Sequence, residues 1–116
     1  MNYTTESLIL RDVTNDDLTE VARTWPSDHR PISEEEAKGV IAYIRQNAEK
    51  NIKGCIYHLC LAVCRSDNPR TIIGWCGLDG RCSHTEPEIF ILIDDEYQNK
   101  GYGTICVKAL LCHVPR

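Results

Sequence analysis

The segment Gln98–Thr104 carries the clearest chemical pattern in the sequence. Its two glycines, Gly101 and Gly103, lie between an apolar run that predicts a strand, Ile89–Ile93, and the start of a predicted helix. Glycines in such a loop let backbone N–H groups converge on an anion, and the positive end of the helix dipole strengthens the attraction. The segment therefore predicts a loop that binds phosphate or pyrophosphate.

Two other nucleotide-binding patterns do not fit this loop. A Walker loop requires Gly-Lys followed by Ser or Thr, and this sequence has no such run. The dinucleotide fingerprint requires a third glycine and a place in the first β-α-β unit of the chain. A tight turn without a ligand is the remaining alternative, because Gly-x-Gly before a helix is common in turns.

Two carboxylates near the same strand are candidates for a general base. Glu88 directly precedes Ile89–Ile93, and Glu86, two residues earlier, would share its strand face. A carboxylate at such a place can take a proton from an amine, directly or through water. The alternative is a solvated or salt-bridged glutamate at the end of a strand.

The cysteines favour core packing. The chain has seven, an odd number, and most lie in apolar runs, which predicts buried free thiols in a reducing cytoplasm. Cys60 and Cys64 would share a strand face with His58, but no Cys-x-x-Cys pair exists, so no metal site is predicted. Cys112 beside His113 would make a poor nucleophile–base pair, because adjacent helical residues point in different directions.

Length and composition indicate one globular domain over residues 1–116. The chain is 42% hydrophobic and 26% charged, with a net charge of −4. No apolar stretch is long enough to span a bilayer, and the first residues lack the pattern of a signal peptide, so we expect no membrane partner and a cytoplasmic location. Because no stripe of Lys and Arg is present, we expect no nucleic-acid partner.

Apolar periodicity predicts an α/β (α+β) domain with the element order β-α-α-β-β-β-α. Gly74 and Gly77 within one strand predict bulges or the close approach of another group. The predicted elements are a strand (Leu8–Val13), a helix capped by Asn15 with Leu18, Val21, Ala22 and Trp25 on its apolar face, a helix with the capping box Ser33 and Glu36, a hairpin of strands (Ile56–Cys64 and Thr71–Leu78), the strand Ile89–Ile93, and a last helix with Val107, Leu110, Leu111 and Val114 on one side.

In this context the stretch Glu88–Thr104 resembles the acetyl-CoA-binding segment of the GNAT N-acetyltransferases. That family carries an Arg/Gln-x-x-Gly-x-Gly/Ala loop after its fourth strand, matched here by Gln98, Gly101 and Gly103. The order of the elements fits as well, and Leu8–Arg11 resembles the opening of the branch that acetylates ribosomal proteins. The resemblance implies a mixed, mostly antiparallel sheet flanked by helices.

The resemblance implies acetyl-CoA as a co-substrate and no metal. Backbone groups of Ile91, Leu92 and Ile93 would bind the pantetheine arm like an added strand. Gln98 stands where Arg is commoner, so one positive charge is absent and weaker binding is expected. The pyrophosphate would be bound by the loop and the helix start, that is, by Gln98, Asn99, Lys100, Gly101, Tyr102, Gly103 and Thr104.

The resemblance also implies the direct transfer of an acetyl group to a primary amine, on a small molecule or a protein N-terminus, in a ternary complex. The backbone N–H of Leu92 would bind the developing oxyanion, and Glu88 would be the general base. The family pattern continues beyond the last helix with further strands and often a Tyr that protonates the departing thiolate. We therefore expect a domain that is incomplete at its C-terminus, with no residue assignable to that role.

An incomplete domain would leave Ile89–Ile93 as an apolar sheet edge, which predicts a homodimer through that edge or a piece of a longer gene product. The alternatives to an enzyme are a non-catalytic module that binds CoA or a partner, and a structural domain without affinity for CoA. The acceptor is not readable from the sequence.

Overall fold

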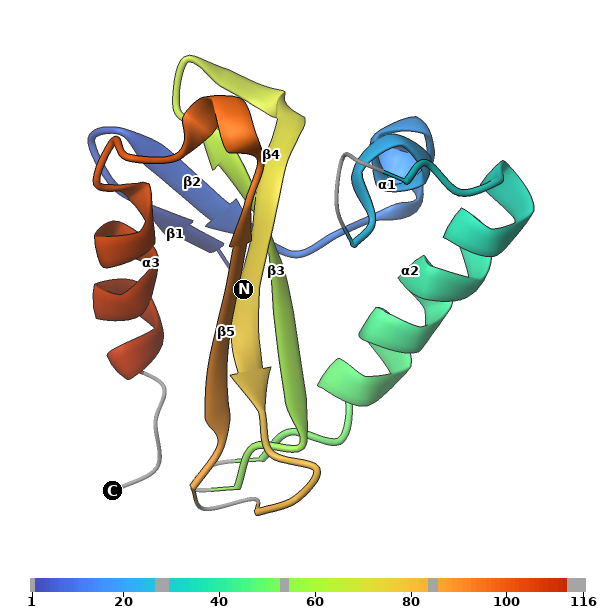
Figure 1. Cartoon of the computed structure of the whole chain (residues 1–116). Helices are drawn as coiled ribbons and strands as arrows, with labels where there is room; N and C mark the ends of the chain where they lie inside the picture. The colour runs from blue at the N-terminus through green and yellow to red at the C-terminus, as the bar shows by residue number, and fades with distance from the viewer. Residues whose placement is uncertain (1, 27–29, 53–54, 84–85, 113–116) are drawn as a thin grey trace.

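The computed structural model places five strands in one antiparallel sheet (Figure 1). It describes residues 2–26, 30–52, 55–83 and 86–112. The strands lie in the sheet in the same order as along the chain, and every neighbouring pair is antiparallel. The strands are β1 (Asn2–Thr4), β2 (Leu8–Arg11), β3 (His58–Arg65), β4 (Asn68–Asp79) and β5 (Glu88–Ile93).

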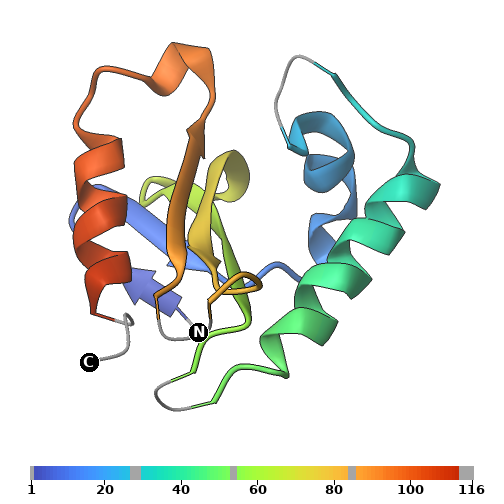
Figure 2. The same cartoon turned by 60° about the horizontal axis from the view of Figure 1, so that its bottom comes forward.

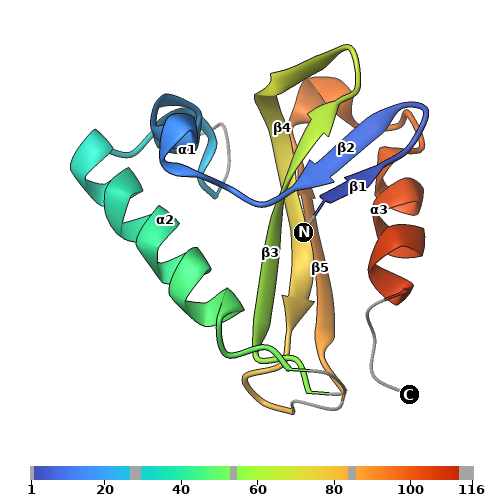
Figure 3. The ribbon, with the colours of Figure 1, turned by 180° about the vertical axis from the view of Figure 1, so that it is seen from behind.

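Helices cover both faces of the sheet. The helices α1 (Leu18–Thr24) and α2 (Glu34–Ala48) lie on one face, and α3 (Tyr102–Leu111) lies on the other, as Figures 2 and 3 show from two further directions. Short 3-10 turns at Asn15–Asp17 and Asp95–Tyr97 precede α1 and α3. The predicted α+β fold class is confirmed. No helix in the described part of the chain is long and apolar enough to cross a membrane.

Two expectations about the N-terminal region are wrong. The first predicted strand ends at Arg11, and the sequence analysis did not predict β1, which pairs with β2 as a hairpin. The helix cap is Thr14, whose extended backbone leaves its hydroxyl free to accept from the Asp16 N–H, at 3.3 Å. The predicted cap, Asn15, is already inside the 3-10 turn.

The capping box of α2 is confirmed. The Ser33 hydroxyl accepts a hydrogen bond from the Glu36 N–H at 3.0 Å, and the Glu36 carboxylate accepts one from the Ser33 N–H at 3.3 Å. Ala37, Ile41 and Ile44 then face the sheet and are buried. This cap fixes where α2 begins and therefore which of its residues reach the sheet.

The two faces of the sheet carry separate apolar cores. The α1 and α2 side contains the indole of Trp75, and the α3 side contains Leu61 and Cys76, all fully buried. Nearly all of β3 is buried on both faces, as the long apolar run predicts. Four of the cysteines, Cys60, Cys64, Cys76 and Cys106, are buried free thiols.

The last helix turns a different side to the sheet than the apolar pattern predicts. Cys106 and Leu110 are buried, whereas Leu111 is 48% exposed. Tyr102 and Ala109 extend the buried face, so the contact follows the 102–106–109–110 positions. Val114, which the prediction placed on this face, lies outside the described residues.

Within the described sheet, β5 is an edge strand. It pairs with β4 alone, and the side chains of Ile89 and Leu92 are 39% and 48% exposed. The apolar edge expected from the sequence is thus present in this part of the chain. A homodimer through it stays a prediction.

Close approach explains the two glycines of β4. A Cβ at Gly74 would collide with the backbone of Leu92 and Ile93, and one at Gly77 with the carbonyl of Leu59 and the ring of Phe90. We therefore expect Gly77→Ala to lower the free energy of unfolding by about 1–3 kcal/mol, because the crowded sheet must shift.

The matched control is Gly39→Ala on the exposed side of α2, where a Cβ meets nothing within 4 Å. This change should raise the free energy of unfolding by about 0.5–1 kcal/mol, since alanine favours a helix. Urea denaturation followed by circular dichroism measures both. Equal effects of the two substitutions would contradict the close approach at Gly77.

Candidate functional site

The edge strand β5 faces two different surroundings on its two sides. The side chains of Ile91 and Ile93 pack into the core under α3, whereas Phe90 packs into the core under α1 and α2. Successive residues of a strand point to opposite faces, so Glu88 and Leu92 lie on the Phe90 side. A cavity opens on each side of this strand.

The backbone of β5 alternates in the same way. The Asp94 N–H donates to the Ile73 carbonyl of β4 at 2.8 Å, which makes Trp75 and Leu92 the neighbouring hydrogen-bonded pair. The N–H and C=O of Leu92 therefore point into the sheet, and those of Ile91 and Ile93 point away from β4. The pairing removes Leu92 as a backbone donor for a ligand and leaves Ile91 and Ile93.

The loop that follows β5 is tied back to the strand by Gln98. Its side-chain amide donates to the Ile93 carbonyl at 2.9 Å and approaches the Asp95 carboxylate at 3.3 Å. The loop then turns through two left-handed residues, Asn99 at φ 62° and Gly101 at φ 81°. Glycine and asparagine are the residues that adopt this conformation most readily. The bonds from Gln98 shape the loop, and a role of its side chain at a phosphate stays a prediction.

The start of α3 has free N–H groups. Gly101 is the N-cap residue and supplies no side-chain hydrogen bond, unlike Ser33 at the start of α2. The first backbone bond of the helix runs from the Ile105 N–H to the Gly101 carbonyl, at 3.3 Å. The N–H groups of residues 102–104 precede that bond and have no partner inside the helix. They form a positive helix end suited to an anion.

A cavity of about 250 Å³, which we call the loop cavity, joins this helix start to β5. Its lining includes most of the predicted cofactor residues, and Tyr97, which the sequence analysis did not select. The lining residues are Ile91, Ile93, Tyr97, Gln98, Asn99, Gly101, Tyr102 and Gly103. Leu92, Lys100 and Thr104 do not line it. A Cβ at Gly101 or Gly103 would meet no atom within 4 Å, so the glycines leave open space where a ligand can lie.

A larger cavity of about 620 Å³, which we call the aromatic cavity, lies on the other side of β5. Rings from four different elements or segments line it, together with three charged side chains near one end. The lining residues are Trp25, Pro26, Tyr43, His58, Asp79, Arg81, Glu88, Ile89, Phe90, Ile91 and Leu92. Ile91 lines both cavities, so both reach the middle of β5.

Cross-strand register explains why these side chains meet. His58 pairs with Asp79, and Asp79 pairs with Glu88, which sets the three in one row across β3, β4 and β5. Two residues along, in the next row on the same face, Gly77 has no side chain. The Phe90 ring therefore extends over it and stacks on His58, with centroids 5.9 Å apart and planes at 19°. The missing side chain of Gly77 thus shapes the floor of the cavity.

One end of the aromatic cavity carries an ion pair. The Arg81 guanidinium donates to the Asp79 carboxylate at 2.9 and 2.7 Å and to the Tyr43 hydroxyl of α2 at 2.7 Å. These bonds hold the pKa of Asp79 at about 2. Burial, and then the charge of Arg81, lower the pKa of His58. The imidazole is therefore neutral at neutral pH, and the Asp79 and Arg81 charges cancel.

The two predicted carboxylates differ in position. Glu88 begins β5 and lines the aromatic cavity with an exposed side chain. Glu86 lies in the bend before the strand and lines neither cavity, so the expectation that it shares the face of Glu88 is wrong. The geometry keeps Glu88 as the candidate of the two.

Helix α1 is fastened to β4 and to the end of β5 by polar contacts. The Glu20 carboxylate accepts from the Ile72 N–H at 2.8 Å, and Arg23 donates to the Ile72 carbonyl at 2.7 Å. The Thr24 hydroxyl donates to the buried Asp94 carboxylate at 3.2 Å, directly before the loop that leads to α3. These bonds hold Trp25, the next residue, at the edge of the aromatic cavity.

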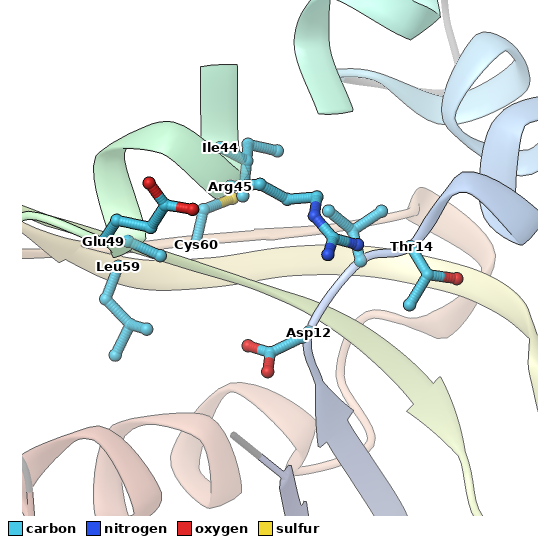
Figure 4. A pocket seen from close by; sticks show the side chains of 9 residues that line it. Asp12, Thr14, Ile44, Arg45, Glu49, Leu59 and Cys60 are labelled. Atoms are coloured by element: carbon cyan, nitrogen blue, oxygen red, sulfur yellow. The ribbon is translucent and has the colours of Figure 1, made fainter. Parts of the chain in front are cut away.

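A further cavity, of about 300 Å³, lies between α2, β3 and the segment after β2 (Figure 4). Ile44 and the thiol of Cys60 lie on its inner side, and Arg45 extends from α2 toward Asp12 and Thr14. Burial raises the pKa of Cys60 to about 12, which makes it a poor nucleophile. No residue of β5 or of the loop after it contributes to this cavity.

The described residues contain no group of three or more His, Cys, Asp or Glu side chains that could hold a metal ion. Cys60 and Cys64 are instead part of the core beside Trp75. The pairing of Cys112 with His113 cannot be placed, because His113 lies outside the described residues.

Comparison with protein families decides the relationship. Residues 7–115 match the model of the acetyltransferase (GNAT) domain. The chain belongs to the GNAT acetyltransferase family. No curated protein sequence matches it.

Solved structures show the same GNAT fold. A proposed ribosomal-protein-serine acetyltransferase from Vibrio cholerae superposes with a TM-score of 0.75 at 23% identity, over 96% of this chain and 64% of that protein. A GNAT-family acetyltransferase from Bordetella pertussis gives 0.73 at 15% identity, over 97% and 70%. A phosphinothricin acetyltransferase from Sinorhizobium meliloti, solved in complex with AcCoA, gives 0.58 at 18% identity, over 89% and 57%. The chain thus spans about two thirds of the length of the first two.

Sequence reasoning found the loop of this GNAT domain and missed most of the aromatic cavity. The ring residues Trp25, Tyr43 and Phe90 are far apart in the sequence and carry no motif. His58 entered only as an unfavoured metal ligand beside two cysteines. Strand register brings His58 and Phe90 together once β3, β4 and β5 are aligned, whereas Trp25 and Tyr43 reach the cavity through the packing of α1 and α2 on the sheet.

The contacts of Glu20 that hold α1 to β4 predict how the free energy of unfolding changes at acid pH. Burial raises the pKa of Glu20, but hydrogen bonds from Arg23 and the Ile72 N–H outweigh it and hold the pKa below its usual value. A carboxylate with a lowered pKa stabilises the fold at neutral pH, and that contribution is lost as the pH falls through the lowered pKa. Glu20→Gln should therefore cost about 1 kcal/mol of unfolding free energy at pH 7.

The difference from the unsubstituted chain should shrink when urea denaturation is repeated between about pH 5 and pH 3. Glu6→Gln, at an exposed turn before β2, is the control and should change stability little at either pH. A Glu20→Gln deficit that is as large at pH 3 as at pH 7 would contradict an ionic role for Glu20.

Proposed function

We propose that this GNAT domain transfers an acetyl group from acetyl-CoA to a primary amine, with CoA in the loop cavity and the acceptor in the aromatic cavity. One observation carries the proposal: the two cavities lie on opposite faces of the same edge strand and both are lined by Ile91. A donor and an acceptor bound on the two sides would meet at that residue, which is the arrangement that direct transfer in a ternary complex requires.

The loop cavity fits the cofactor in three respects. The N–H groups at the start of α3 can bind a pyrophosphate, and the open space at Gly101 and Gly103 admits it. The outward N–H groups of Ile91 and Ile93 can pair with an amide-containing arm laid along the strand. The related Sinorhizobium meliloti structure is described in complex with AcCoA.

The reaction places particular demands on β5. Acetyl-CoA, when bound, supplies an activated acetyl thioester. The outward N–H of Ile91 would bind the acetyl carbonyl oxygen and stabilise the charge that develops there. The rings of Trp25 and Phe90 would exclude water from the amine. The role that the resemblance gives to the Leu92 N–H thus moves by one residue, because the Leu92 N–H points into the sheet.

Glu88 lies at the far end of the acceptor side. It is four residues from Leu92, which is about 13 Å along an extended strand. As a general base it would therefore need a chain of water molecules between its carboxylate and the reacting amine. That role stays a prediction from the resemblance.

CoA binding is tested with a substitution at Gly103. Gly103→Glu should weaken the binding of CoA by more than about 100-fold in calorimetric titration, because a carboxylate would face the phosphates. Gly39→Glu is the matched control, since it adds the same charge to an exposed helix position away from both cavities. Equal affinity of the two folded variants for CoA would mean that CoA binds outside the loop cavity. If the unsubstituted chain does not bind CoA, only a structural role of the domain would remain.

The role of the Ile91 N–H as a hydrogen-bond donor is tested by two substitutions of Ile91. Ile91→Pro removes an N–H that points away from the sheet, so the ladder with β4 keeps its hydrogen bonds. We expect kcat for acetylation of a primary amine to fall by about 100-fold or more. Ile91→Val keeps the N–H and should keep kcat near that of the unsubstituted chain.

Product should be measured by mass spectrometry of the acetylated amine, because the exposed Cys82 and Cys112 would react with thiol reagents. A folded Ile91→Pro variant with unchanged kcat would show that the Ile91 N–H does not bind the acetyl carbonyl oxygen in the reaction. Intact CoA binding without acetylation of any amine by the unsubstituted chain favours the alternative function, a non-catalytic CoA-binding module.

A further inference from the structure

The end of the aromatic cavity farthest from Leu92 carries polar side chains that binding a simple amine does not require. We call His58, Asp79 and Glu88, the row across β3, β4 and β5, the distal row. All three line the aromatic cavity, and their side chains lie on the same face of the sheet because directly paired residues of antiparallel strands do.

His58 is the unusual member of the row. Its residue is 7% exposed, and its Nδ1 is buried with no hydrogen-bond partner in the described part of the chain. The ring lies against Phe90 on one strand and faces Tyr43 of α2 at a centroid distance of 6.1 Å. Buried polar atoms of folded proteins nearly always have a partner, so an unpaired ring nitrogen beside a cavity points to a ligand that supplies one.

The charges of the row determine what that ligand is. The Asp79 carboxylate is committed to Arg81, and Arg81 also donates to Tyr43. The Glu88 carboxylate has no ion pair among the described residues, and the neutral imidazole of His58 offers a lone pair. The row therefore accepts hydrogen bonds and carries one uncompensated negative charge, which suits an ammonium group.

Position along the strand then fixes the length of the acceptor. On the proposed function, the reacting amine lies near Ile91 and Leu92, and Glu88 is about 13 Å from Leu92 along the strand. The wall between these ends is mostly apolar, formed by Phe90 and Trp25. An acceptor that reaches both ends must be elongated, with an apolar middle.

We propose that the distal row is a second recognition point of the acceptor site, which selects elongated amines with a second cationic group about 13 Å from the reacting one. His58 and Glu88 bind that second ammonium. Glu88 then holds a charge of the acceptor rather than the proton of the reacting amine. The inference rests on the proposed acetyl transfer, which places the reacting amine.

The test compares amines of matched length. Product formation is measured by mass spectrometry for decylamine and α,ω-diaminodecane, and for butylamine and α,ω-diaminobutane. We expect kcat/KM for α,ω-diaminodecane to exceed that for decylamine by about tenfold, because one charge-assisted contact is gained. The short pair should show no preference, since its second ammonium cannot reach the distal row.

Two variants assign the preference to residues. His58→Phe keeps a ring on Phe90 and removes both nitrogens, and Glu88→Gln removes the charge. Each should lower the ratio of kcat/KM for α,ω-diaminodecane to kcat/KM for decylamine toward one. Glu6→Gln, in the turn before β2, lines neither cavity and should keep the preference. If Glu88→Gln lowers kcat for decylamine and the diamine equally, Glu88 is a general base and the proposal is wrong.

A binding measurement separates this proposal from the proposed function. The ring C–H signals of His58, assigned by their loss in His58→Phe, are followed in a ¹H–¹³C spectrum without CoA. A shift with α,ω-diaminodecane and none with neutral 1-decanol supports the distal row, and it does so even if no amine is acetylated, a result that would overturn acetyl transfer alone. Identical responses to these two compounds, or no preference for the long diamine over decylamine in the kinetics, would overturn the distal row.

Discussion

The alternation of β5 is the constraint on which both cavities depend. A strand sends successive side chains and successive backbone N–H groups in opposite directions, so one short segment can serve a cofactor and an acceptor on separate faces. The bond from the Asp94 N–H to the Ile73 carbonyl fixes which residues face which way. A shift of one residue in register would turn Phe90 and Leu92 toward α3 and Ile91 toward α1 and α2, and would exchange the linings of the two cavities.

Close packing along β5 and polar bonds at its end both hold the strand in this register. Gly77 and Gly74 allow neighbouring backbone and the Phe90 ring to approach so closely that a Cβ at either position would force the sheet to shift. At the end of β5, the Asp94 carboxylate accepts from Thr24, and Gln98 holds the Ile93 carbonyl. The strand is therefore fixed by packing along its length and by polar bonds where it leads into the loop. The bond between Thr24 and Asp94 also connects α1 directly to the segment that leads into the loop.

The sequence predicted well what short-range chemistry determines. The capping box of Ser33 and Glu36, the glycine loop and the buried run of β3 each depend on residues within one element, and each is present. What it predicted poorly depends on partners distant in the chain. The direction of the Leu92 N–H follows from pairing with β4, and the buried side of α3 follows from the sheet beneath it, which favours Cys106 over Leu111. The place of His58 in the aromatic cavity can be recognised only from its pairing with Asp79 and its stacking on Phe90.

The loop cavity depends mainly on backbone groups, and the aromatic cavity depends on side chains. Gln98 illustrates this difference. This residue fits the loop motif, yet its amide is used to hold the Ile93 carbonyl and approaches Asp95. On the proposed function, anion binding would thereby be left to backbone N–H groups at the start of α3, which follow the left-handed Gly101. Substitutions of other loop side chains leave those groups in place. The aromatic cavity is built from side chains of several elements, so a single substitution there alters what it accepts. On the proposed function, specificity therefore depends on the face of β5 that lines the aromatic cavity, and cofactor binding depends on the geometry of the loop.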